Sequence, residues 1–228
     1  MADALVQPKP YRGLAMEGPI ASWYARNTAR DRRRFAAIAR AVLAEVPPGG
    51  RILEVAPGPG YLSVELARAG RRVTAIDISE SFVRMVRANA AQAGVDIEIR
   101  HGNASELPFP DAAFDFVVCV AAFKNFTEPL RALQEMYRVI GAGGQASIHD
   151  LRSDASPADI DAEVRGMGLS AWNAFLTRWT FRHMLLKRAY SRADLERMSA
   201  AVHADRSGIL LNGIGYELRL RKDDRPRR

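Results

Sequence analysis

Apolar residues recur along this chain with two different periods, and together they predict alternating strands and helices. Short apolar runs typical of buried strands occupy 51–56, 72–76, 96–100, 114–120 and 145–149. Between these runs, apolar residues return every three or four positions, which is the helical period, over 61–69, 81–93 and 129–140. Strands that alternate with helices favour a doubly wound α/β fold with a mostly parallel sheet.

The two ends of the chain add further elements to this pattern. Helical spacing runs over 20–45, and again over 158–167 and 170–189 after the fifth strand. Near the end, 208–211 and 216–220 alternate around Asn212-Gly213, which is typical of a hairpin and brings the sheet to seven strands. We expect a single domain over 1–228. Its parts are an N-terminal helical lid (1–46), a core (50–150), a helical cap or insertion before the last two strands (151–192), and a C-terminal helix and hairpin (193–228).

The first strand runs into a turn made of Pro57-Gly58-Pro59-Gly60, and this turn restricts the possible ligands. Glycines without a Cβ let a flat ligand lie on the main chain. A dinucleotide needs a third glycine and N–H donors for its pyrophosphate, but Ser63 stands at the third position and the prolines remove two donors. Glu54, inside the strand, suits an ammonium or sulfonium group instead. An NAD-dependent oxidoreductase is therefore disfavoured.

Three segments resemble the class I S-adenosylmethionine-dependent methyltransferases. Residues 54–60 resemble that family's acidic-x-Gly-x-Gly-x-Gly motif, with Ala56 in place of the first glycine. Residues 102–109 resemble its Gly-Asp-Ala followed by Leu-Pro-Phe, with Asn103 in place of the acid, and 114–118 resemble its Phe-Asp-hydrophobic strand. The resemblance covers about residues 50–150. It implies a Rossmann-like methyltransferase fold, with S-adenosyl-L-methionine as cofactor and S-adenosyl-L-homocysteine as product.

Specific residues follow for the cofactor site. Asp77 ends the second strand, 17 residues after Gly60, a spacing that suits a carboxylate accepting both ribose hydroxyls. The alternative is a helix cap, for which Ser79 is better placed. Asn103 would read the adenine amino group, or it is a turn asparagine. The predicted cofactor-binding residues are Tyr24, Glu54, Ala56, Gly58, Gly60, Asp77, Ile78, Asn103, Ala104 and Val120.

The N-terminal helical segment would cover the cofactor, as the resemblance implies. Its candidate residues are Met16, Glu17, Tyr24, Arg26 and Asn27, with Tyr24 placed to reach the methionine end. The simpler alternative is that Trp23 and Tyr24 are packing aromatics.

The acceptor side is less defined. Lys124 and Asn125 follow the fourth strand and would line an acceptor pocket, although a loop lysine is often only solvated. His149 and Asp150 end the fifth strand, where an acid/base group would face an acceptor. Alternation sends them to opposite sides, and we prefer Asp150 as the catalytic residue, unless either side chain only caps the loop.

The bulky residues of 170–189, including Trp172 and Trp179, allow three interpretations. They would form ordinary core under the lid, a cap that binds a hydrophobic or aromatic acceptor, or a helix lying on a membrane surface.

The charge and composition of the chain are consistent with a methyltransferase that acts on a small molecule. The net charge of +7 and pI near 10.0 raise the question of nucleic acid, but the basic residues are dispersed and only four of 33 are lysines. The segment 123–126 also lacks the Asn/Asp-Pro-Pro-aromatic signature of enzymes that methylate nucleobase amines. A single cysteine, Cys119, favours a reducing, cytoplasmic compartment. The four histidines show no metal-ligand spacing, and the longest apolar run, 116–123, is far shorter than a membrane span.

The sequence thus predicts S-adenosylmethionine-dependent methyl transfer to an oxygen, nitrogen or carbon of a small-molecule acceptor. Two alternatives remain. One is an RNA or ribosome methyltransferase, and the other is a relative of the same fold that holds the cofactor without transferring methyl, as a binding module or a cyclase. No oligomeric state is indicated.

Overall fold

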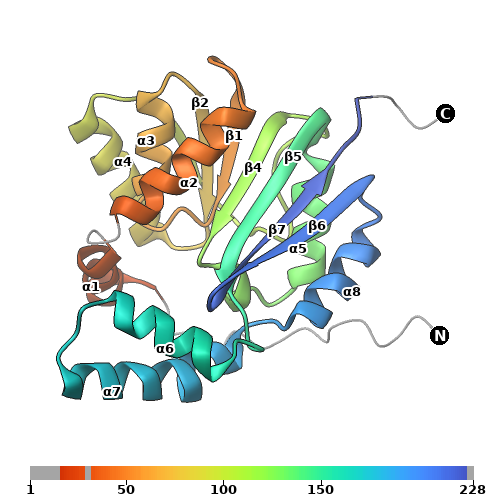
Figure 1. The fold of residues 1–228 in the computed structure, drawn as a ribbon. Coiled ribbons are helices and arrows are strands. Elements are labelled where there is room, and N and C mark those ends of the chain that lie inside the picture. Colours follow the sequence, from red (N-terminus) through yellow and green to blue (C-terminus); the bar gives the residue numbers. More distant parts are fainter. Residues whose placement is uncertain (1–15, 29–31, 225–228) are drawn as a thin grey trace.

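Seven strands form one sheet in the order β3-β2-β1-β4-β5-β7-β6 (Figure 1). The structure is a computed structural model that describes residues 16–28 and 32–224. Parallel pairs join the first five strands, whereas β7 is antiparallel to both β5 and β6. The doubly wound, mostly parallel sheet with a final antiparallel hairpin is therefore confirmed. The strands are β1 (Arg51–Val55), β2 (Arg72–Asp77), β3 (Ile97–His101), β4 (Phe114–Val120), β5 (Ile140–Leu151), β6 (Arg206–Asn212) and β7 (Gly215–Arg221).

Helices cover both faces of this sheet, as a parallel sheet requires. On one face α2 (Arg32–Glu45), α3 (Tyr61–Arg68) and α4 (Glu80–Ala93) bury Val42, Leu66 and Val86. On the other face α5 (Pro129–Arg138) and α8 (Arg192–Val202) bury Leu133 and Leu195. Cys119 of β4 is fully buried, in keeping with a strand thiol that packs and does not react.

The glycine run at 141–144 lies between the predicted helix at 129–140 and the predicted strand at 145–149, where we expected it to end the helix, but the structure places it inside a strand. The preceding helix ends at Arg138, and the glycines lie inside β5, where the pairing shifts between Phe114↔Ile140 and Phe116↔Gln145. A Cβ on Gly144 would approach the carbonyl oxygen of Asp115 to 2.7 Å. Glycine is therefore needed for close approach of two strands at an irregular register.

The predicted helical insertion before the last two strands is confirmed, with one change of geometry. It consists of α6 (Pro157–Gly166), α7 (Ala171–Thr180), a π-turn η3 (Phe181–Leu185) and a 3₁₀ turn η4 (Leu186–Arg188). Ile160, Phe181 and Ile214 form a small separate core that fixes it to the hairpin turn. In Figure 1 the insertion and α1 (Gly18–Thr28) lie below the sheet, at the end where the parallel strands finish. The division into lid, core, cap and C-terminal parts stays a prediction.

Candidate functional site

The connection between β1 and α3 is a tight turn built on two left-handed glycines. Gly58 has φ 56° and Gly60 has φ 81°, a region that L side chains rarely adopt. Gly60 also packs against α4, because a Cβ there would approach a Val86 methyl to 2.9 Å. The turn therefore presents bare main chain at the end of β1.

Two alanines at the ends of adjacent strands share this left-handed conformation. Ala56, after β1, has φ 56°, and its N–H donates to Ile76 O at 2.8 Å. Ala121 follows the half-buried Val120 at the end of β4, has φ 57°, and donates to His149 O at 2.7 Å. Each costs about 1–2 kcal/mol relative to a right-handed residue. Backbone strain of this kind gathers at functional sites.

Asp77 turns toward the glycine turn. One carboxylate oxygen accepts from Gly58 N–H at 3.2 Å and the other from Ser79 N–H at 2.9 Å. The side chain is 5% exposed, and burial raises the pKa of Asp77 to about 6. Each oxygen keeps acceptor capacity for a ligand hydroxyl. Ser79, not Asp77, caps α4 by accepting from Phe82 N–H, as expected from the sequence.

Glu54 is buried in the same region, and its contact with α3 was not foreseen. The Ser63 hydroxyl donates to its carboxylate, and the Glu54 residue is 2% exposed. Burial raises the pKa of Glu54 to about 8, and the charge of Asp77 adds to that rise. Ser63 lies in the first turn of α3, nine residues after Glu54, which was the only signal available in the sequence.

The ends of β2 and β3 carry the residues predicted to meet adenine. Ile78 is 67% exposed, an unusual position for a large apolar side chain so close to the core. Asn103 is also exposed, and its side-chain oxygen accepts from Ser105 N–H at 3.0 Å. This is the turn geometry of the alternative, and it leaves the oxygen one lone pair. Ala104 is half-buried beside it. The adenine roles stay predictions.

Helix α1 packs over the glycine turn. Tyr24 Cε1 lies 3.7 Å from the position a Cβ on Gly58 would take, and the Tyr24 ring packs edge to face on Phe82 with centroids 5.8 Å apart. The Tyr61 hydroxyl donates to Ala25 O at 3.0 Å. Tyr24 therefore is a packing aromatic and also covers the glycine turn. Its contact with the cofactor stays a prediction.

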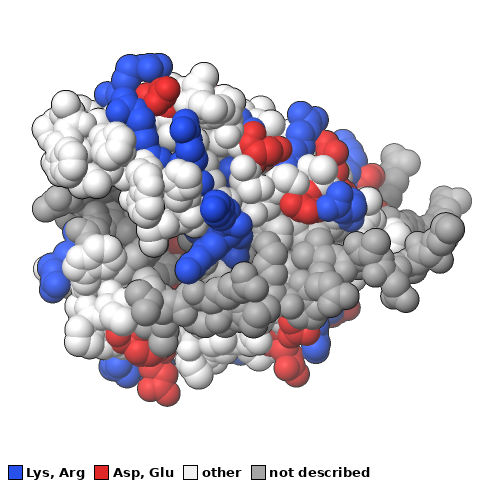
Figure 2. Space-filling view, turned by 90° about the horizontal axis from the view of Figure 1, so that it is seen from below, with Lys and Arg blue, Asp and Glu red and all other residues white. Residues whose placement is uncertain are grey.

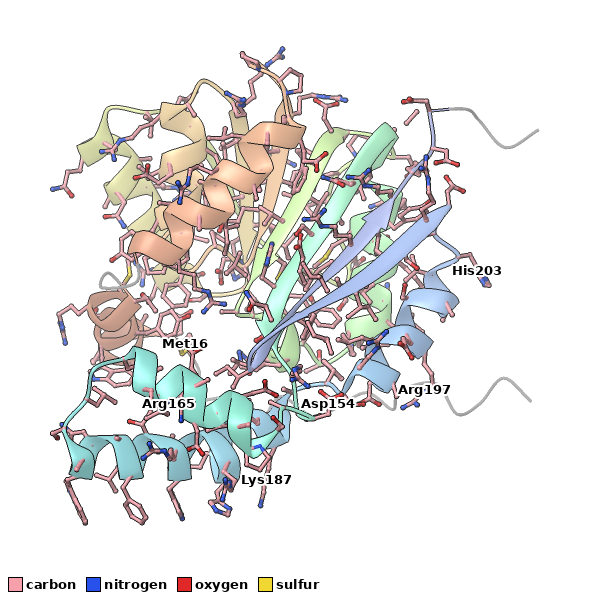
Figure 3. The ribbon with its side chains drawn as sticks, viewed as in Figure 1. Met16, Asp154, Arg165, Lys187, Arg197 and His203 are labelled. Carbon is pink, nitrogen blue, oxygen red and sulfur yellow. The ribbon has the colours of Figure 1, made fainter. Side chains whose placement is uncertain are left out.

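The residues before α1 bind the start of α4. Ser79 Oγ donates to Met16 O at 2.6 Å, and the Glu17 carboxylate accepts from Ser81 N–H at 3.1 Å and from Ser81 Oγ. These hydrogen bonds lower the pKa of Glu17. Figure 3 shows Met16 at the strand ends, above α6 in this view. Of the other lid candidates, Arg26 is exposed, and the side chain of Asn27 lies outside the described residues.

Asp150 and Lys124 form a buried ion pair. Lys124 Nζ lies 2.8 Å from Asp150 Oδ1, and the two side chains are 12% and 0% exposed. The main-chain N–H groups of Lys124 and Leu151 also donate to this carboxylate, each at 2.8 Å. Lys124 is therefore not a solvated loop lysine. Both oxygens of Asp150 are engaged, so this carboxylate holds the turn η2 (Phe123–Asn125) onto β5, as in the loop-capping alternative. Its catalytic role stays a prediction. Asn125 lies exposed at the end of η2.

His149 lies on the opposite face of β5, as strand alternation predicts. His149 Nε2 is 2.7 Å from Ser147 Oγ, which donates to Glu217 Oε1 at 2.8 Å. Burial lowers the pKa of His149, so a neutral imidazole is favoured. His149 is thus part of a polar cluster on β5 and β7, and its proposed catalytic role stays a prediction.

Trp172 and Trp179, which we predicted to contact the substrate, lie on α7 of the insertion, and this role stays a prediction. These side chains are 68% and 51% exposed, and α7 has no buried residue. Figure 3 shows the long side chains of α7 pointing down, away from the sheet. The interpretation of 170–189 as ordinary core is therefore wrong for α7, although Phe181 and Leu186, which follow it, are buried in the small core of the insertion. Helical period identified an apolar face but not the direction in which that face points.

Within the described residues, no group of three or more His, Cys, Asp or Glu could hold a metal ion. The same part of the chain has no helix of the length and apolar character required to cross a membrane.

Comparison with known proteins identifies a family for part of the chain. Residues 53–148 match a protein family described as "Methyltransferase domain". A demethylmenaquinone methyltransferase of Listeria monocytogenes is 36% identical over 112 residues, which is 47% of this chain and 47% of that relative. The chain thus spans about half the length of the curated relatives it matches first.

Two solved structures share the fold at low identity. A SAM-dependent methyltransferase from Aquifex aeolicus superposes with a TM-score of 0.61 at 19% identity, over 80% of this chain and 88% of that one. A magnesium protoporphyrin IX methyltransferase from Synechocystis PCC 6803, with bound SAH, superposes with a TM-score of 0.60 at 15% identity, over 84% of each chain. At this level of identity, the two superpositions show that the chain shares its fold with these methyltransferases.

Proposed function

We propose that this chain, whose residues 53–148 match a methyltransferase domain, transfers a methyl group from S-adenosyl-L-methionine to a small-molecule acceptor, as class I methyltransferases do. The observation that carries this proposal is a pair of buried carboxylates, Glu54 and Asp77, beside the glycine turn. Across residues 16–28 and 32–224, neither of them forms an ion pair with a basic side chain.

Two buried acids that lack a basic partner fit a cationic ligand. Burial disfavours their charged forms, and an opposite charge nearby restores ionisation. S-adenosyl-L-methionine carries a sulfonium and an ammonium and no phosphate, whereas a pyrophosphate would add negative charge. Asp77 would hold the ribose hydroxyls with its remaining acceptor capacity, and Glu54 would lie near the positive end of the ligand.

The remaining residues would position the cofactor. Ile78 would pack on one face of adenine, with Asn103 and Ala104 at its edge, and Tyr24 would cover the other end. The cofactor supplies a methyl group already activated on sulfur. The protein then needs mainly to align the acceptor and exclude water, a contribution of up to about 7–11 kcal/mol. A strong base is therefore not required for every acceptor.

For the acceptor we propose a hydrophobic or aromatic small molecule, methylated on oxygen, nitrogen or carbon. The demethylmenaquinone methyltransferase relative supports this class. The buried Cys119 thiol fits a reducing compartment, and we propose that the protein acts in the cytoplasm.

Calorimetry and product analysis test the proposal in two steps. Titration with S-adenosyl-L-methionine should show binding, and titration with NAD should show none. Incubation with a reduced naphthoquinone should then release S-adenosyl-L-homocysteine. Binding of NAD in preference to S-adenosyl-L-methionine would overturn the cofactor assignment.

A protein of this fold that holds the cofactor without transferring methyl is the second candidate. The contacts of Asp150 favour it, because this carboxylate is engaged by Lys124 and by main-chain N–H groups. Tight cofactor binding with no S-adenosyl-L-homocysteine for any acceptor class would support it. An RNA methyltransferase would instead show RNA binding that falls steeply with added salt.

A further inference from the structure

Helix α7 carries a continuous row of large apolar side chains that faces solvent. Trp172, Phe175, Leu176 and Trp179 follow the spacing i, i+3, i+4, i+7, which places them on one face. Their exposed fractions are 68%, 57%, 43% and 51%. Trp172 and Phe175 stack on each other with ring centroids 6.0 Å apart. Monomeric proteins rarely leave such a contiguous row uncovered.

The orientation of this row is fixed by contacts on the other side of the helix. Ala174 packs on the small core formed by Ile160 and Phe181, and Arg178 Nε lies 2.7 Å from Asp161 Oδ1 of α6. Because α7 is held from its inner side, rotation of the helix to bury the tryptophans would break these contacts. The exposed row is a property of the docked insertion.

The row continues into η3 and η4, where apolar and basic side chains alternate. Met184 and Leu185 are 53% and 39% exposed. Arg182, Lys187 and Arg188 are exposed beside them, and the described part of the chain contains no ion-pair partner for these three. Figure 3 places Lys187 at the end of the same lower side of the insertion.

Charge on this segment has one sign only. Residues 164–193 contain six basic residues and no Asp or Glu, although acids lie on either side at Glu163 and Asp194. Figure 2 views the molecule from below, where uncharged side chains fill the left of the surface and basic side chains lie next to them. An anionic partner surface is therefore complementary, while a second copy of the same face would place like charges together.

We propose that the face formed by Trp172, Phe175, Trp179, Met184, Lys187 and Arg188 binds the interface of an anionic lipid bilayer. Tryptophan side chains favour the headgroup region, and each basic side chain near an anionic surface adds about 1 kcal/mol. An amphipathic helix with aromatic residues on one side and basic residues at its border is the form that lies in such an interface. The helix rests on the membrane and does not span it.

Vesicle sedimentation tests this surface directly. The wild-type chain should bind vesicles of phosphatidylcholine with about one-third phosphatidylglycerol at least tenfold more tightly than phosphatidylcholine alone, and added salt should weaken binding. The triple variant Trp172→Ser, Phe175→Ser, Trp179→Ser should lose at least tenfold in vesicle affinity. Leu210→Ser is the matched control, since Leu210 is 61% exposed on β6, and its affinity should be unchanged.

A spectroscopic measurement keeps the test independent of folding losses. Trp23→Phe leaves Trp172 and Trp179 as the tryptophans of the chain, and their emission should shift to the blue on anionic vesicles. Absence of vesicle binding by the wild-type chain would overturn the proposal. So would a concentration-dependent dimer that the triple variant abolishes, because that outcome assigns the face to a second copy. Both measurements omit the methyl donor and acceptor, so their outcome does not depend on the proposed function.

Discussion

Two regions contain side chains whose burial is unusual for their type, but in opposite ways. One is the rim, which is the edge of the sheet at the carboxyl ends of β1 and β2, and the other is the insertion with α6 and α7. At the rim, the carboxylates of Glu54 and Asp77 are buried. In the insertion, Trp172 and Trp179 are exposed. Each departure is stabilised by neighbours: main-chain N–H groups hold Asp77, and an ion pair with α6 holds α7. The first departure is consistent with the cationic cofactor proposed for the rim, and the second with the membrane contact proposed for the insertion.

The largest expected effect compares a buried ion pair of the sheet, which joins η2 to β5, with the exposed ion pair of the insertion. Lys124→Ala removes the partner of the fully buried Asp150 carboxylate, and we expect the free energy of unfolding to fall by about 3–5 kcal/mol. Arg178→Ala removes an ion pair of nearly the same length in the insertion, whose side chains are 37% and 41% exposed, and should cost about 0–1 kcal/mol. Urea denaturation measures both. Equal losses in the free energy of unfolding would mean that burial does not determine the contribution of these two ion pairs.

The second prediction concerns the ligand. Asp77→Ala removes a charged acceptor from two hydroxyls, each worth about 1.5–3 kcal/mol, so the affinity for S-adenosyl-L-methionine should fall by about 100-fold or more. Trp179→Ala should leave that affinity unchanged, because the side chain is 51% exposed on a helix that buries none of its residues. Calorimetry gives both values, and circular dichroism checks that the Asp77 variant is folded. A tryptophan variant that binds as weakly as the aspartate variant would return α7 to the cofactor site.

The third prediction compares a glycine of the rim with a glycine of the insertion, both of which have a left-handed φ. Gly60→Ala combines a left-handed φ of 81° with a methyl at 2.9 Å from Val86, and should destabilise the fold by about 2–4 kcal/mol. Gly168→Ala in the insertion has a similar φ of 62° and open space around it, and should cost only about 1 kcal/mol. Thermal unfolding of the two variants separates conformation from packing. The double variant Gly60→Ala, Val86→Ala should lose the close contact while keeping the strain of φ.

The smallest expected effect is a dependence on pH. Burial raises the pKa of Asp77 to about 6, and the cofactor is expected to prefer the ionised carboxylate. Protonation of Asp77 should therefore lower the affinity by about tenfold between pH 7 and pH 5. Asp77→Asn, which lacks this titration, should bind more weakly at pH 7 and fall about tenfold less over the same range, because any contribution of Glu54, whose pKa is about 8, is common to both proteins. A wild-type affinity that is flat between pH 5 and 7 would contradict the ionised form as the binding state.

Much of the rim was predictable because local rules agree there. The short run 51–55, the glycines at 58 and 60 and the acid at 77 each predict their own conformation, and parallel strands bring their ends together. The Ser63–Glu54 contact and the Lys124–Asp150 pair were not predictable, because each joins elements whose relative rotation depends on the assembled core.

In the insertion, the helices were predictable from the sequence, but the direction of their apolar side chains was not. Its helical spacing was clear, but a period of 3.6 residues does not tell which element lies against the apolar face. The outward direction of Trp172 follows from Ala174 and Arg178, small and charged residues whose partners lie on α6 and η3. The glycine run in β5 was misinterpreted for a related reason, since close approach to Asp115 is invisible along one strand.

Met16, Glu17 and Gly18 form hydrogen bonds with Ser79 and Ser81, and these bonds have a consequence for ligand affinity. Ser79 also donates to Asp77 through its main chain, so the loop that binds the segment before α1 would also contact the ligand proposed for Asp77. By thermodynamic reciprocity, whatever tightens that loop for one partner tightens it for the other to the same degree. Release of a bound molecule is then coupled to the lifting of a segment some 60 residues away in the chain, and hydrogen exchange at Gly18 and Ser81 would report it.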